Sequence, residues 1–110
     1  MYYRDFYRLD RRNCKGSRSY PDLMMFSSYD TGKLQGFFSN YERYNDSDVS
    51  VSYRPRPYDI DITIHTNLDR GDSRCHYKMM EAMEYVKNIV IENCAYSQDA
   101  IEITLEVYTA

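Results

Sequence analysis

The apolar residues between Ser73 and Asn93 recur at the spacing of an α-helix, and this periodicity constrains the fold more than any other feature of the sequence. The stripe consists of Cys75, Met79, Ala82, Met83, Val86, Ile89 and Val90. Such a pattern predicts an amphipathic helix that buries one face against another element. Asp72 or Ser73 can cap its first turn, and Gly71 lets the chain turn into it. We therefore predict a helix over residues 74–93.

Three other stretches alternate apolar and polar residues, which is the period of a strand with one buried face. They cover residues 49–54, 59–65 and 101–108. Because proline cannot donate to a strand ladder, the four residues Arg54-Pro55-Arg56-Pro57 are expected mainly in the connection between the first two strands. The helix follows the second strand and precedes the third. This β-β-α-β order predicts a helix packed on the apolar face of an antiparallel or mixed sheet.

The first 47 residues support more than one interpretation. A helical stripe is formed by Leu34, Phe37, Phe38, Tyr41 and Tyr44. Asp30 or Thr31 would cap this helix, although Gly36 costs it roughly 1 kcal/mol relative to alanine. The alternative is a hairpin from Leu23 to Phe38 that turns at residues 30–33. Residues 2–9 and 23–28 are expected to form additional strands.

The chain of 110 residues is long enough for one ordinary domain. We predict a single α+β domain over residues 1–110. It contains a mostly antiparallel sheet of four or five strands, one long helix (about 74–93) packed on one face, and a shorter aromatic helix around residues 33–44.

Hydrophobic runs and cysteines bear on the compartment. No run approaches the roughly 20 apolar residues that a membrane span needs. The first residues lack the layout of a secretory signal peptide, and the three cysteines form an odd and sparse set that fits a reducing environment. We therefore expect a cytoplasmic protein without disulfides, in the host cytoplasm if the protein is viral.

Charge is distributed unevenly along the chain. Residues 1–20 hold six basic and two acidic side chains, a net charge of +4, whereas residues 21–110 hold eight basic and fifteen acidic side chains, a net charge of -7. The chain also contains thirteen tyrosines and no tryptophan. Tyrosine offers a large contact area at low rotamer cost and is enriched at interfaces. These features favour recognition of another macromolecule.

In size, acidic body and tyrosine load, the chain resembles small phage-encoded inhibitors of host defence, including anti-CRISPR proteins. The resemblance implies a non-enzymatic protein-binding module, phage- or virus-encoded, that inhibits a host defence complex by protein–protein interaction or by nucleic-acid mimicry. The resemblance then implies a protein partner, such as a component of a nucleic-acid-processing complex. We expect its contacts at the stiff proline connection and on the acidic face of the long helix, at Arg54, Arg56, Tyr58, Glu81 and Glu84.

Direct nucleic-acid binding is the alternative function. The N-terminal segment 1–20 interleaves arginines with aromatic residues, and arginine pairs with phosphates while tyrosine stacks on exposed bases. The candidate contacts are Arg4, Arg8, Arg11 and Arg12. A sequence pI near 5.3 runs against the basic footprint that such domains usually show.

Enzymatic and metal-binding functions have weaker support. If the isoleucines of the strand at 59–65 face the helix, the opposite face carries Asp59, Asp61 and His65, and Glu102 and Glu106 can join them. Such carboxylates can hold a divalent cation for phosphoryl transfer. No phosphate-binding glycine loop accompanies them. The residues Cys14, His65, Cys75 and His76 lack the paired spacing of a zinc site. We therefore expect no cofactor and no metal.

Overall fold

The computed structural model describes residues 2–39 and 49–109. Within them, four strands and two α-helices occur in the order β1 (Tyr2–Asp10), α1 (Ser28–Phe37), β2 (Ser50–Pro55), β3 (Asp59–His65), α2 (Arg74–Asn93) and β4 (Ala100–Tyr108). Two short 3₁₀ helices, Arg11–Asn13 and Leu23–Met25, lie between β1 and α1. The predicted α+β class is confirmed, and the long helix has the predicted limits.

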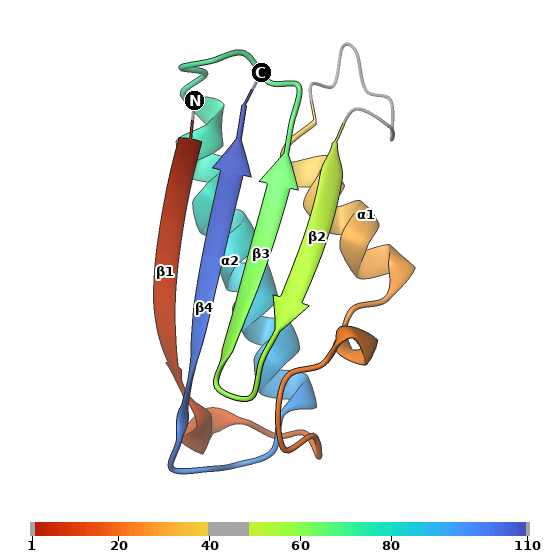
Figure 1. Ribbon diagram of the computed structural model, residues 1–110, viewed down its shortest axis with the longest axis vertical. Helices are drawn as coiled ribbons and strands as arrows, with labels where there is room; N and C mark the ends of the chain where they lie inside the picture. Colours follow the sequence, from red (N-terminus) through yellow and green to blue (C-terminus); the bar gives the residue numbers. More distant parts are fainter. Residues whose placement is uncertain (1, 40–48, 110) are drawn as a thin grey trace.

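The four strands form one mixed sheet in the order β1-β4-β3-β2 (Figure 1). The central pair, β3 and β4, is parallel, whereas β1 pairs antiparallel with β4 and β2 pairs antiparallel with β3. α2 connects β3 to β4 behind the sheet in Figure 1, which makes the crossover right-handed, as parallel connections almost always are. Two of the three ladders are antiparallel, as predicted.

The core lies between α2 and the two central strands. Ile60, Ile62 and Ile64 of β3 have no exposed surface, and neither do Ile101, Ile103, Leu105 and Val107 of β4. Their alternation with more exposed residues places one face of each strand against the helix. From α2, the buried residues are Cys75, Met79, Ala82, Met83, Val86 and Val90. Each fully buried isoleucine contributes about 1.5–3 kcal/mol of hydrophobic stabilisation.

The first helix is present, and the alternative hairpin over residues 23–38 is not. α1 begins earlier than predicted because Ser27 is its N-cap: the Ser27 hydroxyl accepts from the Asp30 amide, and the Asp30 carboxylate accepts from the Ser27 amide. This reciprocal capping box fixes the first turn. Leu34 and Phe38 of the predicted stripe are fully buried. Tyr41 and Tyr44 lie outside the described residues.

Two local predictions were wrong. Residues 23–28 do not form a strand: Leu23–Met25 is a 3₁₀ turn that buries Met25, whose Sδ atom lies 3.9 Å from Cys94 Sγ at the end of α2. A core contact of one side chain, rather than a strand ladder, orders this segment. Arg54 and Pro55 are not in the connection but at the end of β2, paired with Asp61 and Ile60. The proline is tolerated there because β2 is an edge strand.

The segment after β1 closes the C-terminal end of α2. The backbone amides of Lys15, Gly16 and Arg18 donate to the carbonyl oxygens of Ile91, Cys94 and Asn93, at 2.8, 2.8 and 3.0 Å. These carbonyls lie at the helix end, where intrahelical partners are lacking. Gly16 lies directly against the Asn93 backbone, where an added Cβ would come within 2.1 Å of the Asn93 carbonyl carbon. The approach therefore requires glycine.

Replacing Gly16 by alanine should force this segment away from α2. We expect Gly16→Ala to lower the free energy of unfolding by about 2–3 kcal/mol, measured by urea denaturation. Gly36→Ala in α1 is the matched control, because nothing lies within 4 Å of the added methyl group. It should stabilise the protein by about 0.5–1 kcal/mol. Equal effects of the two substitutions would contradict the close approach at Gly16.

Candidate interface on the open face of the sheet

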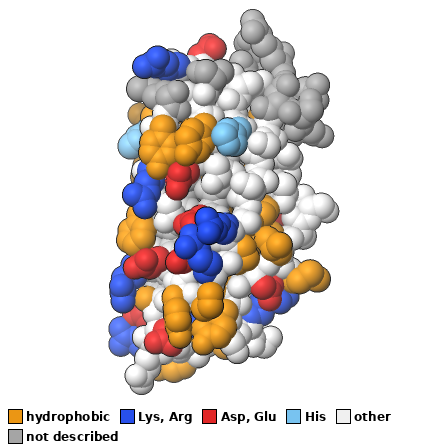
Figure 2. All heavy atoms as spheres, viewed as in Figure 1, with side chains coloured by type: hydrophobic (Ala, Val, Ile, Leu, Met, Phe, Trp, Pro, Cys, Tyr) orange, Lys and Arg blue, Asp and Glu red, His pale blue; other side chains and the backbone are white. Residues whose placement is uncertain are grey.

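Both helices lie on the same side of the sheet, behind it in Figure 1. No described helix or strand covers the other side, which is the face turned to the viewer in Figures 1 and 2. We call this surface the open face. Its side chains come from even-numbered residues of β1, β2 and β4 and from odd-numbered residues of β3, because side chains alternate between the two faces of a strand. The register aligns them in rows across the sheet.

One end of the open face carries a row of aromatic rings. Tyr2, Tyr108 and His65 are aligned on β1, β4 and β3. The Tyr108 ring lies 5.0 Å from the Tyr2 ring and 4.9 Å from the His65 ring, and the His65 pair is stacked at 12°. The Tyr108 hydroxyl donates to the Glu106 carboxylate at 3.2 Å. All three rings remain exposed, so the row is a preformed aromatic surface at the upper end of Figure 2.

The middle of the open face carries charges of both signs (Figure 2). Arg8 lies 3.6 Å from Glu102, and Arg56 forms ion pairs with Asp59, at 3.0 Å, and with Asp61. Arg4 is aligned with Glu106, and Arg54 with Asp61. These pairs are partly or largely exposed, so each contributes little to stability. Their effect is to balance the charge of the face.

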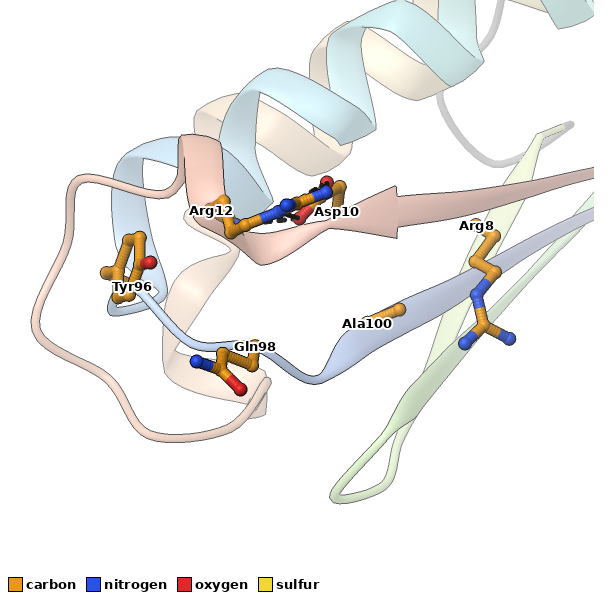
Figure 3. Close-up of a pocket in the computed structure, with 6 residues that line it drawn as sticks. All are labelled: Arg8, Asp10, Arg12, Tyr96, Gln98 and Ala100. Carbon is orange, nitrogen blue, oxygen red and sulfur yellow. Dashed lines mark hydrogen bonds and ion pairs between the residues drawn. The ribbon is translucent and has the colours of Figure 1, made fainter.

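A cavity of about 610 Å³ lies at the other end of the open face (Figure 3). It is lined by Arg8, Asp10, Arg12, Tyr96, Gln98 and Ala100, which come from β1, the turn after it, and the segment that leads into β4. Ala100 is aligned with Asp10, and its short side chain leaves this end of the sheet hollow. A second hollow continues past Arg8 and Ala100 to Tyr58 and Asp99.

The Asp10 and Arg12 side chains form an ion pair with several hydrogen bonds in this cavity. The Arg12 Nε atom lies 2.9 Å and its Nη2 atom 2.6 Å from Asp10 Oδ2, and the Arg12 amide also donates to Asp10. Side-chain and backbone hydrogen bonds from Arg12 lower the pKa of Asp10 from 3.8 to about 2. The carboxylate therefore holds the Arg12 guanidinium against Asp10, at one wall of the cavity that Tyr96 and Gln98 also line (Figure 3).

The predicted protein contacts lie on two different sides of the molecule. Arg54 and Arg56 lie at the β2–β3 end of the open face, and Tyr58 borders the hollow there. The Tyr58 ring is 53% exposed and meets the Tyr20 ring edge to face at 5.5 Å. Glu81 and Glu84 are on α2, beyond the sheet. One flat surface cannot include both groups.

The predicted nucleic-acid contacts are also separated. Arg4 and Arg8 are exposed on the open face, and Arg12 lines the cavity. Arg11 is 3% exposed, and its guanidinium donates to the Ala95 carbonyl oxygen at 2.9 and 3.2 Å. Arg11 therefore connects the turn after β1 to the segment that follows α2, and its guanidinium is not exposed for a nucleic-acid contact. Three of the four arginines are thus available on one surface.

The acidic residues expected on one face do share the open face, but arginines contact several of them. Asp59 and Asp61 bind Arg56, and Glu102 pairs with Arg8. Among the described residues, no three histidine, cysteine or carboxylate side chains are grouped closely enough to hold a metal ion. Cys14, Cys75 and Cys94 are free and buried, and burial raises the pKa of each thiol, for Cys94 to about 11. Low-pKa thiol chemistry is therefore disfavoured.

Sequence reasoning named Arg8 and Arg12 but missed the other residues that line the cavity. Tyr96, Gln98 and Ala100 follow α2 in a segment without periodicity, and Tyr20 precedes α1 by several residues. Their proximity to Arg8 and Tyr58 depends on the β1–β4 register and on the closure of the α2 C-terminus. The one signal available in the sequence was Ala100, because a small residue at the start of an alternating strand can leave a hollow at that end of the sheet.

Comparison with protein-family models, curated proteins and solved structures gives no match for this chain. No helix in the described part of the chain is long and apolar enough to cross a membrane. Functional inference therefore depends on the geometry of the chain itself.

The Asp10–Arg12 pair can be tested by titration. Because the folded pKa of Asp10 lies below its ordinary value of 3.8, the pair favours the folded state above that pH, and the contribution is lost as pH falls through about 2. We expect the Asp10 carboxyl carbon to titrate by NMR with a midpoint near 2. Arg12→Gln should return the midpoint toward 3.8. A midpoint near 3.8 in the unsubstituted protein would contradict this arrangement.

Proposed function

We propose that the protein is a non-enzymatic recognition module that binds another protein through the open face of its sheet. The observation that carries the proposal is a four-stranded face that no described helix or strand covers and that bears tyrosine, phenylalanine and arginine side chains with balanced charges. Tyrosine, phenylalanine and arginine are enriched in protein interfaces, and the rim around an interface core is polar.

Exposure on this face supports a contact surface. Phe6 is 50% exposed and Tyr2 is 48% exposed, although both are large side chains on an ordered strand. Tyr58 and Tyr20 add a second aromatic pair at the cavity end. Aromatic anchors surrounded by polar contacts are the usual composition of a binding hot spot. The two aromatic groups thus provide anchors at either end of a charged centre.

The acidic face of α2 supports the interface proposal less well. Glu81, Glu84 and Glu92 form ion pairs with Lys78, Lys87 and Lys15, at 3.5, 2.7 and 3.8 Å. A surface that imitates a phosphate backbone needs uncompensated negative charge. We therefore place the proposed contact at Arg54, Arg56 and Tyr58 rather than at Glu81 and Glu84. Inhibition of a host defence complex stays a prediction about the biological role of this binding.

Affinity capture from host lysate tests the proposal. We expect the protein to recover a partner protein equally well with and without nuclease. Tyr58→Ala combined with Arg54→Ala should lower recovery at least about tenfold, because truncating hot-spot residues costs more than 1 kcal/mol. The control is Glu81→Ala combined with Glu84→Ala, which should leave recovery unchanged. Recovery lost with nuclease, or lost in the α2 variant alone, would refute the proposed surface.

A second candidate function is binding of single-stranded nucleic acid, favoured by the Tyr2–Tyr108–His65 row beside Arg4. Exposed rings on a sheet can stack on bases, at about 1–3 kcal/mol per base. This function predicts that fluorescence anisotropy detects binding to a labelled oligonucleotide at low salt, that added salt weakens it, and that Tyr108→Ala weakens it about tenfold or more. Ser52→Ala, on the same face, is the control. If the anisotropy does not change at low salt, binding of single-stranded nucleic acid is excluded.

A further inference from the structure

The outer edge of β1 differs from the outer edge of β2. β1 is nine residues long, contains no proline, and pairs with β4 in unbroken register from Tyr2 to Asp10. Among the described strands, only β4 pairs with it. β2 is six residues long and ends in Pro55, and Gln35 of α1 reaches over to the Val49 carbonyl beside it. Long, regular edges invite pairing with another strand, and proteins usually protect them.

Hydrogen bonding identifies which backbone groups of β1 face outward. The Phe6 amide donates to the side chain of Asp5, at 2.9 Å, and Glu102 of β4, which is aligned with Arg8, directs its amide to Tyr58 and so away from β1. In an antiparallel ladder, alternate residues direct both backbone groups toward or away from the partner. The even-numbered residues of β1 therefore direct their amides and carbonyls to the outer edge, where a further strand could bind them.

We propose that this edge pairs with β1 of a second copy of the chain, antiparallel and centred on Tyr7. Strand overlap and the charges of β1 together select this register, because two-fold registers centred on Tyr3 or Leu9 would pair only residues 2–4 or 8–10 of each strand. It places Arg4 opposite Asp10 of the second copy and Phe6 opposite Arg8. Two-fold registers centred on Arg4, Asp5, Phe6 or Arg8 each bring like charges together, such as Arg4 against Arg8 when Phe6 is central. Opposite charges across strands stabilise pairing, and like charges oppose it.

The surface between β1 and α2 also carries apolar side chains that a second copy could cover. A groove of about 270 Å³ between β1 and α2 is lined by Phe6, Tyr7, Met80 and Met83, together with the charged residues Asp5, Glu84 and Lys87. Met80 is 60% exposed, and Tyr77, one helical turn earlier, is 65% exposed. A two-fold axis at Tyr7 would bring the two α2 helices together over these side chains. The two sheets would then join into one sheet with a double-width open face.

Sedimentation velocity over a concentration series tests the proposal. We expect the unsubstituted chain to sediment as a dimer in the upper part of the series. Phe6→Pro removes an outward amide together with the Phe6 ring, so it should weaken dimerisation at least about tenfold, and more than Phe6→Ala, which removes the ring alone, while circular dichroism stays unchanged. Arg4→Glu should also weaken dimerisation, because the new carboxylate would lie opposite Asp10 of the second copy and repel it. Arg54→Glu is the matched control and should leave dimerisation unchanged. Arg54 also lies opposite an acidic residue, Asp61, but it is on β2, away from the proposed contact.

Cross-linking tests the register. Cα atoms of directly opposed residues that do not exchange hydrogen bonds lie about 4.5 Å apart, within disulfide range. Tyr7→Cys should therefore form an intermolecular disulfide under mild oxidation, whereas Asp5→Cys and Phe6→Cys should not. Cross-linking of Asp5→Cys or Phe6→Cys in place of Tyr7→Cys would overturn the register. A monomer at every concentration, or a dimer that Phe6→Pro leaves unchanged, would overturn the proposal.

Discussion

Burial of the sheet on one side only is the constraint on which the rest of this structure depends. The fully buried residues of β3 and β4 alternate with polar ones, and α2 supplies one apolar stripe to cover them. The opposite face carries charged side chains, and taking charges out of water is costly even where they are paired. The open face is therefore a direct consequence of how the core is built.

The polar face is ordered even though nothing described covers it. Strand register sets Arg8 beside Glu102 and Tyr108 between Tyr2 and His65. Arg56, at the end of the β2–β3 hairpin, reaches back to two aspartates on β3. The same backbone hydrogen bonds that hold the strands together thus fix the spacing of the rings and charges on the surface. Recognition through this face would need little reorganisation of the backbone.

Contacts between segments that are distant in sequence hold the helices in position. The Tyr85 hydroxyl of α2 donates to Asp30 in the first turn of α1 at 2.6 Å. Burial raises the pKa of Asp30, but hydrogen bonds from Tyr85 and Ser27 outweigh it and lower the pKa overall. Burial and the same hydrogen bond raise the pKa of Tyr85. At the other end of α2, Arg11 and Gly16 bind the segment around Asn93 and Ala95.

The sequence by itself determined the elements whose periodicity is continuous: α2, β3 and β4, and hence the α+β class and the side of each strand that is buried. It also placed Asp59, Asp61 and Glu102 on one face. Only the tertiary structure decided the strand order, the burial of Arg11, the turn at Leu23–Met25 and the cavity beside Ala100. The physical reason is that periodicity reports which face of an element avoids water, whereas neighbours across the sheet and at helix ends are chosen by long-range pairing.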